Sequence, residues 1–356
     1  MRGIVKACRR PPAVRPRDRN GGFPRLSDSV ARGLRCPASP RHALLAESLG
    51  KPSLWVVTKD LWYNSMLIPS AIITGLGLGS MYGLLALGFY VTYAVSKTVN
   101  FAQGSAMMLG AVLTFSFAVT MGWPMWVAVV AALALCALWG VLVERVGVRP
   151  FARRGSDTWL MATVAMGIIL ENVVLFTFGK DPRGMPPSPL TTESFSVADL
   201  KIQLLQVVIP AVGLLIAVAL HLFSYRTKYG KALLAVVQNP DAARLMGINV
   251  TAAIVLTYAL SGLFAGIAGV LIAPLFIISS TMGTLFGIKA FAVAILGGIT
   301  NAWGVMVAGL VYGLAEALIT ALLGSTYTQI VTFTLIIVAL ALRPHGLFGR
   351  AEVKKV

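Results

Sequence analysis

Three ionisable side chains lie inside long apolar stretches of this sequence, namely Glu171, Lys289 and Glu316. An ionisable group at membrane depth costs at least about 2.5 kcal/mol on insertion scales, so it normally faces a bundle interior or a water-filled cavity. Such groups can take part in the passage of a polar solute. The competing interpretation is structural, with each carboxylate protonated or paired inside the bundle and the lysine amine extended to the interface. The sequence leaves both interpretations open.

A second polar element, SKTVNFAQGS from Ser96, interrupts apolar sequence with an asparagine and a glutamine. Broken helices at membrane depth are tolerated where they line a cavity, and the alternative is an ordinary turn at the membrane interface. We therefore take Asn100, Gln103, Glu171 and Glu316 as candidate residues of a translocation path.

Several catalytic signatures are missing from the sequence, and this restricts the chemistry. The three Gly-Lys pairs are followed by Pro, Asp and Ala rather than by Ser or Thr, so the chain has no P-loop for ATP. Its three histidines form no H-E-x-x-H motif, and its three cysteines offer no disulfide framework or C-x-x-C site. We expect neither an enzyme nor a bound metal or cofactor, and the energy for transport would come from elsewhere.

The elements that must position these residues are membrane-spanning helices. Hydrophobic residues make up 57% of the 356 positions and charged residues 12%, whereas ordinary soluble domains are about 25% charged. A helix needs roughly 20 apolar residues to cross the hydrocarbon. The sequence predicts an all-α polytopic integral membrane protein with eight or nine crossings, the ambiguity lying at a short, glycine-broken or re-entrant piece at residues 290–299. The longer candidates are 73–96, 101–121, 124–143, 158–178, 204–223, 252–278, 304–323 and 329–342.

Glycines recur at small-x-x-x-small spacing along several of these spans. Such rows let helix backbones approach closely, so their predicted role is helix packing rather than contact with a solute. The rows are Gly75-Gly79-Gly83, Gly262-Gly266 and Gly309-Gly313.

The first 65 residues differ from the rest of the chain. They carry 13 Lys or Arg against 4 Asp or Glu, together with seven prolines, which is typical of a disordered basic tail. Such an arm could bind anionic lipid or nucleic acid. The alternative is that translation begins at Met66. The transmembrane permease domain then covers residues 66–350, and residues 351–356 form a C-terminal tail.

Basic residues are placed unevenly between the spans. They gather at residues 145–154, at 226–244, and after the last span. By the positive-inside rule these regions face the cytoplasm, whereas the loop at 179–203, with balanced charges and four prolines, should face outside. Three crossings counted back from the first basic loop put the start of the first span outside. The rule disfavours that for a basic tail, so either translation starts at Met66 or the first crossings contain a re-entrant piece.

The polar stretch NPDAARLMGIN begins within a loop at residues 226–250. Asn239 suits the N-cap of a helix and Pro240 its first position. Asp241 complements the positive end of the helix dipole, and Gly247 can take the left-handed C-terminal position. The sequence predicts a helix of about two turns with both ends specified.

One face of this short helix carries Ala242, Leu245 and Met246, because they stand at i, i+3 and i+4. A helix of this length cannot stand alone in water. Its apolar face must therefore contact the membrane surface, the bundle or a partner protein.

The stretch NPDAARLMGIN resembles the cytoplasmic coupling segment of branched-chain amino acid ABC transporter permeases. Three further stretches agree in order and spacing. GLGLGSMYGLLALGFYVTYAVSKTVNFAQGSAMMLGA from Gly75 resembles the first spans of that family, AFAVAILGGITNAWGVMVAGLVYGLAE from Ala290 its glycine-broken segment, and LRPHGLFGR from Leu342 its C-terminal end. The resemblance runs from about Met66 to Arg350.

This resemblance implies a bacterial inner-membrane subunit whose coupling loop and C-terminus are cytoplasmic. It implies two separate ABC ATPase subunits that use ATP, a second permease subunit, and a periplasmic substrate-binding protein. The lipid bilayer is a further partner, and nucleic acid is not expected. The residues implied to dock on the ATPase are Asn239, Pro240, Asp241, Ala242, Ala243, Arg244, Leu245 and Gly247.

Two alternatives stay open. A self-sufficient secondary transporter or channel would need a proton or sodium site, for which Glu171 and Glu316 are the carboxylates well inside the membrane. Related ABC permeases carry urea, amides, aromatic acids or sugars. The sequence does not choose among these substrates, because the binding protein does most of the selecting.

Overall fold

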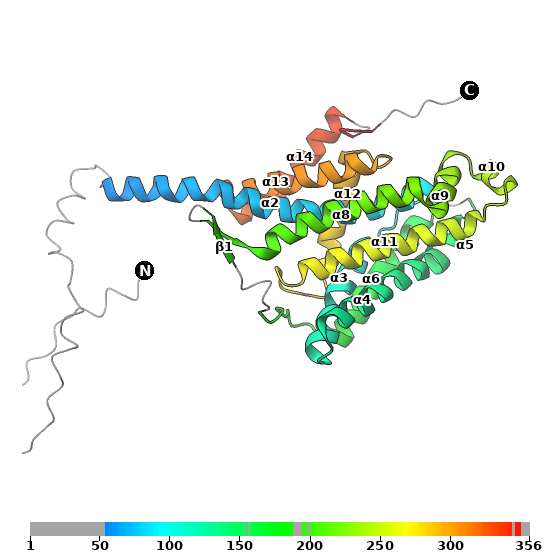
Figure 1. The fold of residues 1–356 in the computed structure, drawn as a ribbon, viewed down its shortest axis with the longest axis horizontal. Helices are drawn as coiled ribbons and strands as arrows, with labels where there is room; N and C mark the ends of the chain where they lie inside the picture. The colour runs from blue at the N-terminus through cyan, green and yellow to red at the C-terminus, as the bar shows by residue number, and fades with distance from the viewer. Residues whose placement is uncertain are drawn as a thin grey trace, which may run out of the picture. The chain divides into compact units, whose positions relative to one another are not determined.

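A computed structural model describes residues 54–152, 154–155, 157–187, 194–197, 200–343 and 346–349. The chain divides into two units, Met1–Lys59 and Asp60–Val356, and the second contains the transmembrane bundle (Figure 1). The helices of the described residues are α2 (Leu54–Ser96), α3 (Gln103–Phe115), α4 (Met125–Leu142), α5 (Arg149–Ala152), α6 (Trp159–Phe178), α8 (Leu204–Arg226), α9 (Lys228–Gln238), α10 (Pro240–Leu245), α11 (Val250–Ile272), α12 (Met282–Gly297), α13 (Ala302–Leu323) and α14 (Ser325–Leu342).

The predicted all-α class is confirmed, with two small additions. The chain continues from α3 and from α4 into π-helical turns, η1 (Ser116–Thr120) and η2 (Val143–Val148). A short antiparallel hairpin, β1 (Ser194–Val197) and β2 (Leu200–Gln203), precedes α8.

Eight of the described helical stretches are long and apolar enough to cross a membrane, which confirms the predicted architecture. The piece left ambiguous by the sequence is α12, whose 16 residues extend for only about 24 Å at 1.5 Å per residue. The eight stretches are Leu67–Ser96, Gln103–Thr120, Met125–Ala152, Trp159–Phe178, Leu204–Arg226, Val250–Ile272, Ala302–Leu323 and Ser325–Leu342.

The first helix begins earlier than the sequence pattern suggested. Since α2 starts at Leu54, residues 54–65 are helical rather than part of an irregular basic tail. These twelve positions contain no proline or glycine and several large apolar residues, so nothing in them breaks a helix. Residues 1–53 and 350–356, which hold the rest of the two predicted tails, lie outside the described residues.

Glycines let α2 and α13 approach each other closely, as their spacing predicted. A Cβ atom on Gly79 would stand 2.7 Å from Leu310 Cα, and one on Gly309 would stand 2.5 Å from Gly83 Cα. Because Gly75 faces Leu314 while Gly83 faces Met306, the two helices run antiparallel. The predicted packing role of these rows is confirmed.

The short helix α12 belongs to a segment that runs between the two ends of the bundle. Arg183, in the loop after α6, and Ile278, before α12, exchange backbone hydrogen bonds of 3.0 and 2.9 Å. At the other end, Leu347 N donates to Leu296 O over 2.7 Å, and Phe348 lines a cavity with the last turns of α8. The described C-terminal residues therefore lie at the same end of the bundle as the segment that follows α8.

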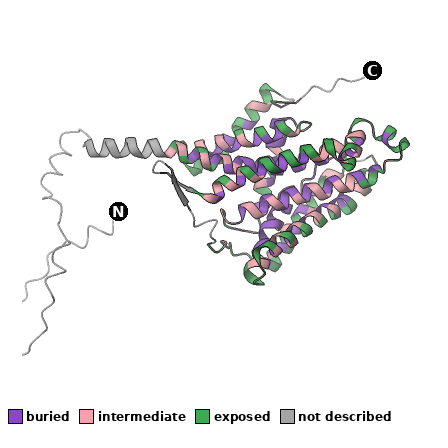
Figure 2. Cartoon of the chain, viewed as in Figure 1, coloured by how far each residue is buried: buried purple, intermediate pink, exposed green. Residues whose placement is uncertain are grey.

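Buried residues gather where the helices face one another, and the outward sides of several spans are exposed (Figure 2). Many exposed residues are large and apolar, such as Phe176 at 87%, Met161 at 68% and Leu215 at 66%. Contiguous apolar surface of this kind is suited to contact with lipid or with another subunit.

Candidate translocation path and coupling segment

The predicted interruption between the first two spans is a buried junction inside the bundle. The chain leaves the helical conformation after Ser96 and re-enters it at Gln103. Thr98 Oγ1 lies 2.7 Å from the Tyr258 hydroxyl, and Asn100 Oδ1 accepts from Ala102 N over 3.1 Å. Non-helical backbone at membrane depth is tolerated where protein or a cavity surrounds it, and here Asn100 Oδ1 satisfies the backbone N–H of Ala102.

The two amide candidates have different surroundings at this junction. Gln103 is fully buried, its Nε2 donates to Ser261 O over 3.0 Å, and its Oε1 accepts from Ser261 Oγ over 2.6 Å. Gln103 thereby ties α3 to α11. Asn100 is also buried, but its Nδ2 has no protein partner, so of the two it keeps an unused donor.

Glu171 connects three helices. Its Oε1 accepts from Ser105 Oγ of α3 over 3.3 Å and from Thr284 Oγ1 of α12 over 2.6 Å. The carboxylate itself belongs to α6 and is half-buried. Within the described residues, both of its hydrogen-bond partners are neutral hydroxyls rather than cations.

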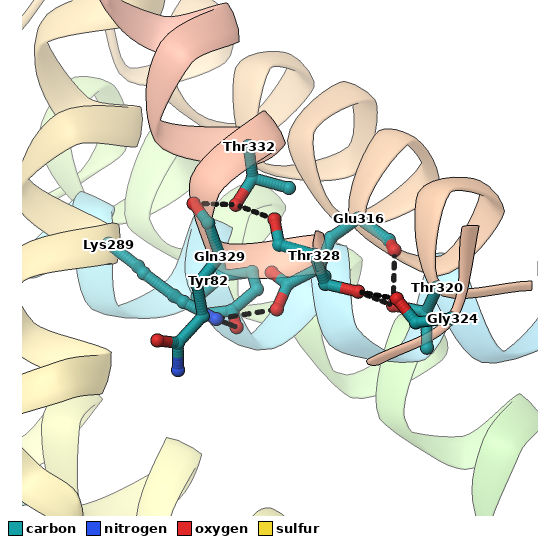
Figure 3. A network of polar contacts seen from close by, with 8 residues as sticks. All are labelled: Tyr82, Lys289, Glu316, Thr320, Gly324, Thr328, Gln329 and Thr332. Atoms are coloured by element: carbon teal, nitrogen blue, oxygen red, sulfur yellow. Dashed lines mark hydrogen bonds and ion pairs between the residues drawn. The ribbon is translucent and has the colours of Figure 1, made fainter. Parts of the chain in front are cut away.

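Glu316 stands in a different cluster, where it meets Lys289 (Figure 3). Lys289 Nζ lies 2.5 Å from Glu316 Oε1 and 3.4 Å from the Tyr82 hydroxyl, to which it donates. Both charged residues are 8% exposed, so the lysine amine does not reach the interface. The interpretation of Glu316 as a carboxylate paired inside the bundle agrees with this contact, whereas the expected extension of the Lys289 amine to the interface is wrong.

Three threonines, Thr320, Thr328 and Thr332, form hydrogen bonds between Glu316 and α14. Thr320 Oγ1 donates to Glu316 O over 2.7 Å and lies 3.0 Å from Thr328 Oγ1, while Thr332 Oγ1 donates to Thr328 O over 2.7 Å. Figure 3 shows these hydroxyls on the facing sides of α13 and α14. Hydroxyls that return to the backbone of their own helix satisfy themselves without water.

One buried carboxylate was missed by the sequence analysis. Glu144 is 2% exposed, lies in η2, and pairs with Arg149 Nε over 3.0 Å. The pattern placed the end of the apolar run at Val143 and counted Arg149 among the basic loop residues. In the sequence, Glu144 is a single acidic residue next to several arginines, and this pattern could have indicated an ion pair.

The polar segment after α9 forms the short capped helix that the sequence predicted. Asn239 Oδ1 accepts from the backbone N–H groups of Asp241 and Ala242, each over 3.0 Å. Pro240 occupies the first helical position, and Gly247 ends the segment at φ +81°. Residues 239–247 are called the coupling segment below.

The apolar face of the coupling segment points away from the bundle. Leu245 is 90% exposed and Met246 82%, whereas Ala243 is buried at 4%. Ala243 packs in a small cluster with residues of α9 and α11, and Arg244 pairs with Asp241 over 3.2 Å at the surface. Ala243 thus packs the coupling segment against the bundle, whereas the side chains of Leu245 and Met246 are mostly exposed.

Eight apolar spans, charged groups inside the bundle and a capped helix projecting from one end define a polytopic membrane protein of the transport class. Residues 71–340 match the family described as "Branched-chain amino acid transport system / permease component". The chain belongs to this family.

Curated relatives agree with the family assignment. The chain is 34% identical over 297 residues to the high-affinity branched-chain amino acid transport system permease protein LivH of Escherichia coli K12, covering 79% of this chain and 96% of that protein. It is 33% identical to the permease BraD of Pseudomonas aeruginosa, with 80% and 97% covered. It is 29% identical to a probable LivH of Methanocaldococcus jannaschii, with 83% and 95% covered.

Proposed function

We propose that this chain is the transmembrane subunit of an ABC importer that passes branched-chain amino acids across the bacterial inner membrane. Two separate ATPase subunits would supply the energy from ATP, a second permease subunit would complete the path, and a periplasmic binding protein would deliver the substrate. The chain itself would bind no cofactor. Support comes from the family match over most of the chain and from the names of its relatives.

The observation that carries the coupling role is the exposure of Leu245 and Met246 on a segment whose caps are satisfied. A six-residue helix gains little stability from its own hydrogen bonds, and here Ala243 and the caps fix its orientation. Exposed apolar side chains on a fixed element are suited to insertion into a cleft of a partner. We assign that partner role to the ATPase, with residues 239–247 and the C-terminus in the cytoplasm.

A charge substitution on the exposed face tests the coupling role. Leu245→Asp should abolish association with the ATPase subunits and leucine uptake, while the purified permease keeps its elution volume and thermal stability. Gln238→Asp adds the same charge beside the segment and serves as the control. ATPase association unchanged in Leu245→Asp would contradict the docking role.

Reconstitution tests the energy source. The complete complex in proteoliposomes should accumulate leucine only with ATP and the binding protein present. Leucine flux through the permease chain without ATPase subunits would favour the self-sufficient transporter instead. Uptake of urea, amides, aromatic acids or sugars in place of leucine would move the substrate to a related class.

A further inference from the structure

A cavity of about 280 Å³ opens between α2, α3, α6 and α12. Its walls are mostly apolar and include the side chains of Phe89, Phe101, Val164, Ile168 and Ile288. The volume lies near the lower end of the roughly 300–1,000 Å³ range of small-molecule sites. It therefore suits a small ligand with a compact apolar part.

The polar groups of this cavity converge on one carboxylate. Ser105 and Thr284 line the cavity, and both donate to Glu171 Oε1. Glu171 stands at i+4 from Gly167 and i+3 from Ile168, two further lining residues, so it shares their face of α6. Among the described residues, the recorded hydrogen bonds to Glu171 use Oε1, and Oε2 is left without a donor.

Glu171 differs from the other carboxylates of the described spans in lacking a cation. Glu144 pairs with Arg149, and Glu316 pairs with Lys289. Within the part of the chain that the structure describes, Glu171 has only hydroxyl partners. Two hydroxyls at helix N-termini compensate the Glu171 carboxylate only in part, so a cationic group from outside this chain would be stabilised further at its side chain.

The open side of the cavity combines exposed apolar side chains with a carboxylate. Ile168 and Ile288 are 54% and 50% exposed beside the half-buried Glu171. A lipid tail against this mouth would face a carboxylate with no counter-charge. The first turns of α3 and α12 border the cavity through Ser105 and Thr284, and the anionic group that the positive ends of these helix dipoles favour is Glu171 itself.

We propose that this cavity binds an α-amino acid with an aliphatic side chain during its passage. The α-ammonium group pairs with Glu171 Oε2, and the aliphatic side chain contacts the apolar walls of the cavity. This assignment rests on the proposed function, which names the substrate class but no residue that contacts it.

Removal of the charge at Glu171 tests the ammonium contact. In the complete complex in proteoliposomes, with saturating binding protein, Glu171→Gln should lower leucine uptake at least about tenfold, because a charge-assisted hydrogen bond is lost. ATP hydrolysis stimulated by the binding protein should stay at the wild-type level. Glu171→Asp keeps the charge and should recover part of the uptake, and Asn172→Gln, on the exposed neighbour, is the control.

A size change in the wall tests the side-chain contact separately. Ile288→Phe should lower uptake of leucine more than uptake of valine, because it fills cavity volume. Leu285→Phe adds the same bulk to an exposed position of α12 outside the cavity wall, and should leave the leucine-to-valine ratio unchanged. This pair keeps the proposal testable even if Glu171→Gln fails to assemble.

The outcomes separate this proposal from the proposed function. A wild-type complex that takes up no branched-chain amino acid overturns the proposed function whatever the variants do. Wild-type uptake that is unaltered in Glu171→Gln, or an equal change for leucine and valine in Ile288→Phe, overturns the cavity assignment alone. Retention of a bound lipid that is lost in Ile288→Phe, with uptake unchanged, would make the cavity a lipid contact.

Discussion

Lys289 of α12 and Glu316 of α13 form a 2.5 Å ion pair, and both residues are 8% exposed. Removal of one member of a buried pair leaves an uncompensated charge, which typically costs about 3–5 kcal/mol. Lys289→Met should therefore lower the thermal midpoint of the detergent-solubilised protein strongly. The double variant Lys289→Met/Glu316→Gln should recover most of the loss.

The exposed pair Arg244–Asp241 is the matched control for that experiment, since its side chains are 64% and 84% exposed. Exposed pairs contribute about 0–1 kcal/mol. Asp241→Asn should therefore leave the midpoint nearly unchanged. If Lys289→Met behaved like Asp241→Asn, the buried pair would not stabilise the fold.

Close packing of α2 on α13 predicts a difference between two glycines two residues apart. Gly79→Ala would bring a methyl group within 2.7 Å of Leu310 Cα, and overpacking of this kind costs about 1–3 kcal/mol. At Gly77 the nearest atom is 4.0 Å away, so Gly77→Ala should gain about 0.5–1 kcal/mol from the helix backbone. Thermal unfolding of the two variants measures the contrast, and equal stabilities would argue against the close approach.

The cap of the coupling segment predicts a local rather than a global effect. Asn239→Ala removes the acceptor of two backbone N–H groups, and lost N-caps cost about 0.5–2 kcal/mol. Amide hydrogen exchange of residues 241–246 should accelerate while exchange in α11 stays slow. Asn239→Ser keeps a capping oxygen and should exchange like the wild type. Fast exchange in both variants would contradict a stabilising role of the N-cap.

The arrangement of loops predicts the side on which each segment is reached. In a protein with Cys8 and Cys36 replaced, a membrane-impermeant thiol reagent added outside intact cells should label Gly184→Cys. It should label Met246→Cys and Leu347→Cys only after permeabilisation, because both lie at the opposite end of the bundle. Labelling of Leu347→Cys and Gly184→Cys from the same side would contradict the finding that the segment containing α12 runs from one end of the bundle to the other.

Local features of this protein could be predicted from its sequence, because they depend on neighbours along the chain. The spans follow from apolar length, and Asn239, Pro240 and Gly247 specify their helix through contacts within one or two turns. The helix α2 begins at Leu54, earlier than the sequence predicted. The basic, proline-rich composition that predicts an irregular tail ends at Pro52, whereas the predicted tail continued to residue 65.

Tertiary partners could not be predicted in the same way. The sequence singled out Glu171, Lys289 and Glu316, but it could not say that Glu316 has a cation and that Glu171 has two hydroxyls. Those partners stand on other helices, and their selection depends on how the helices rotate against one another. Likewise, the periodicity grouped Ala242, Leu245 and Met246, but only the packing of Ala243 shows that this face points outward.

Leu347 N donates to Leu296 O in the last turn of α12. The next residue, Phe348, lines a cavity with the last turns of α8. The end of α8 leads through α9 into the coupling segment, and the cavity that it borders is also lined by Phe348, the neighbour of the residue bound to the last turn of α12. The helix α12 carries Thr284 near its start and Lys289 near its middle. The backbone contact with Leu347 and the side-chain contact with Glu171 therefore stand at opposite ends of a single helix of 16 residues.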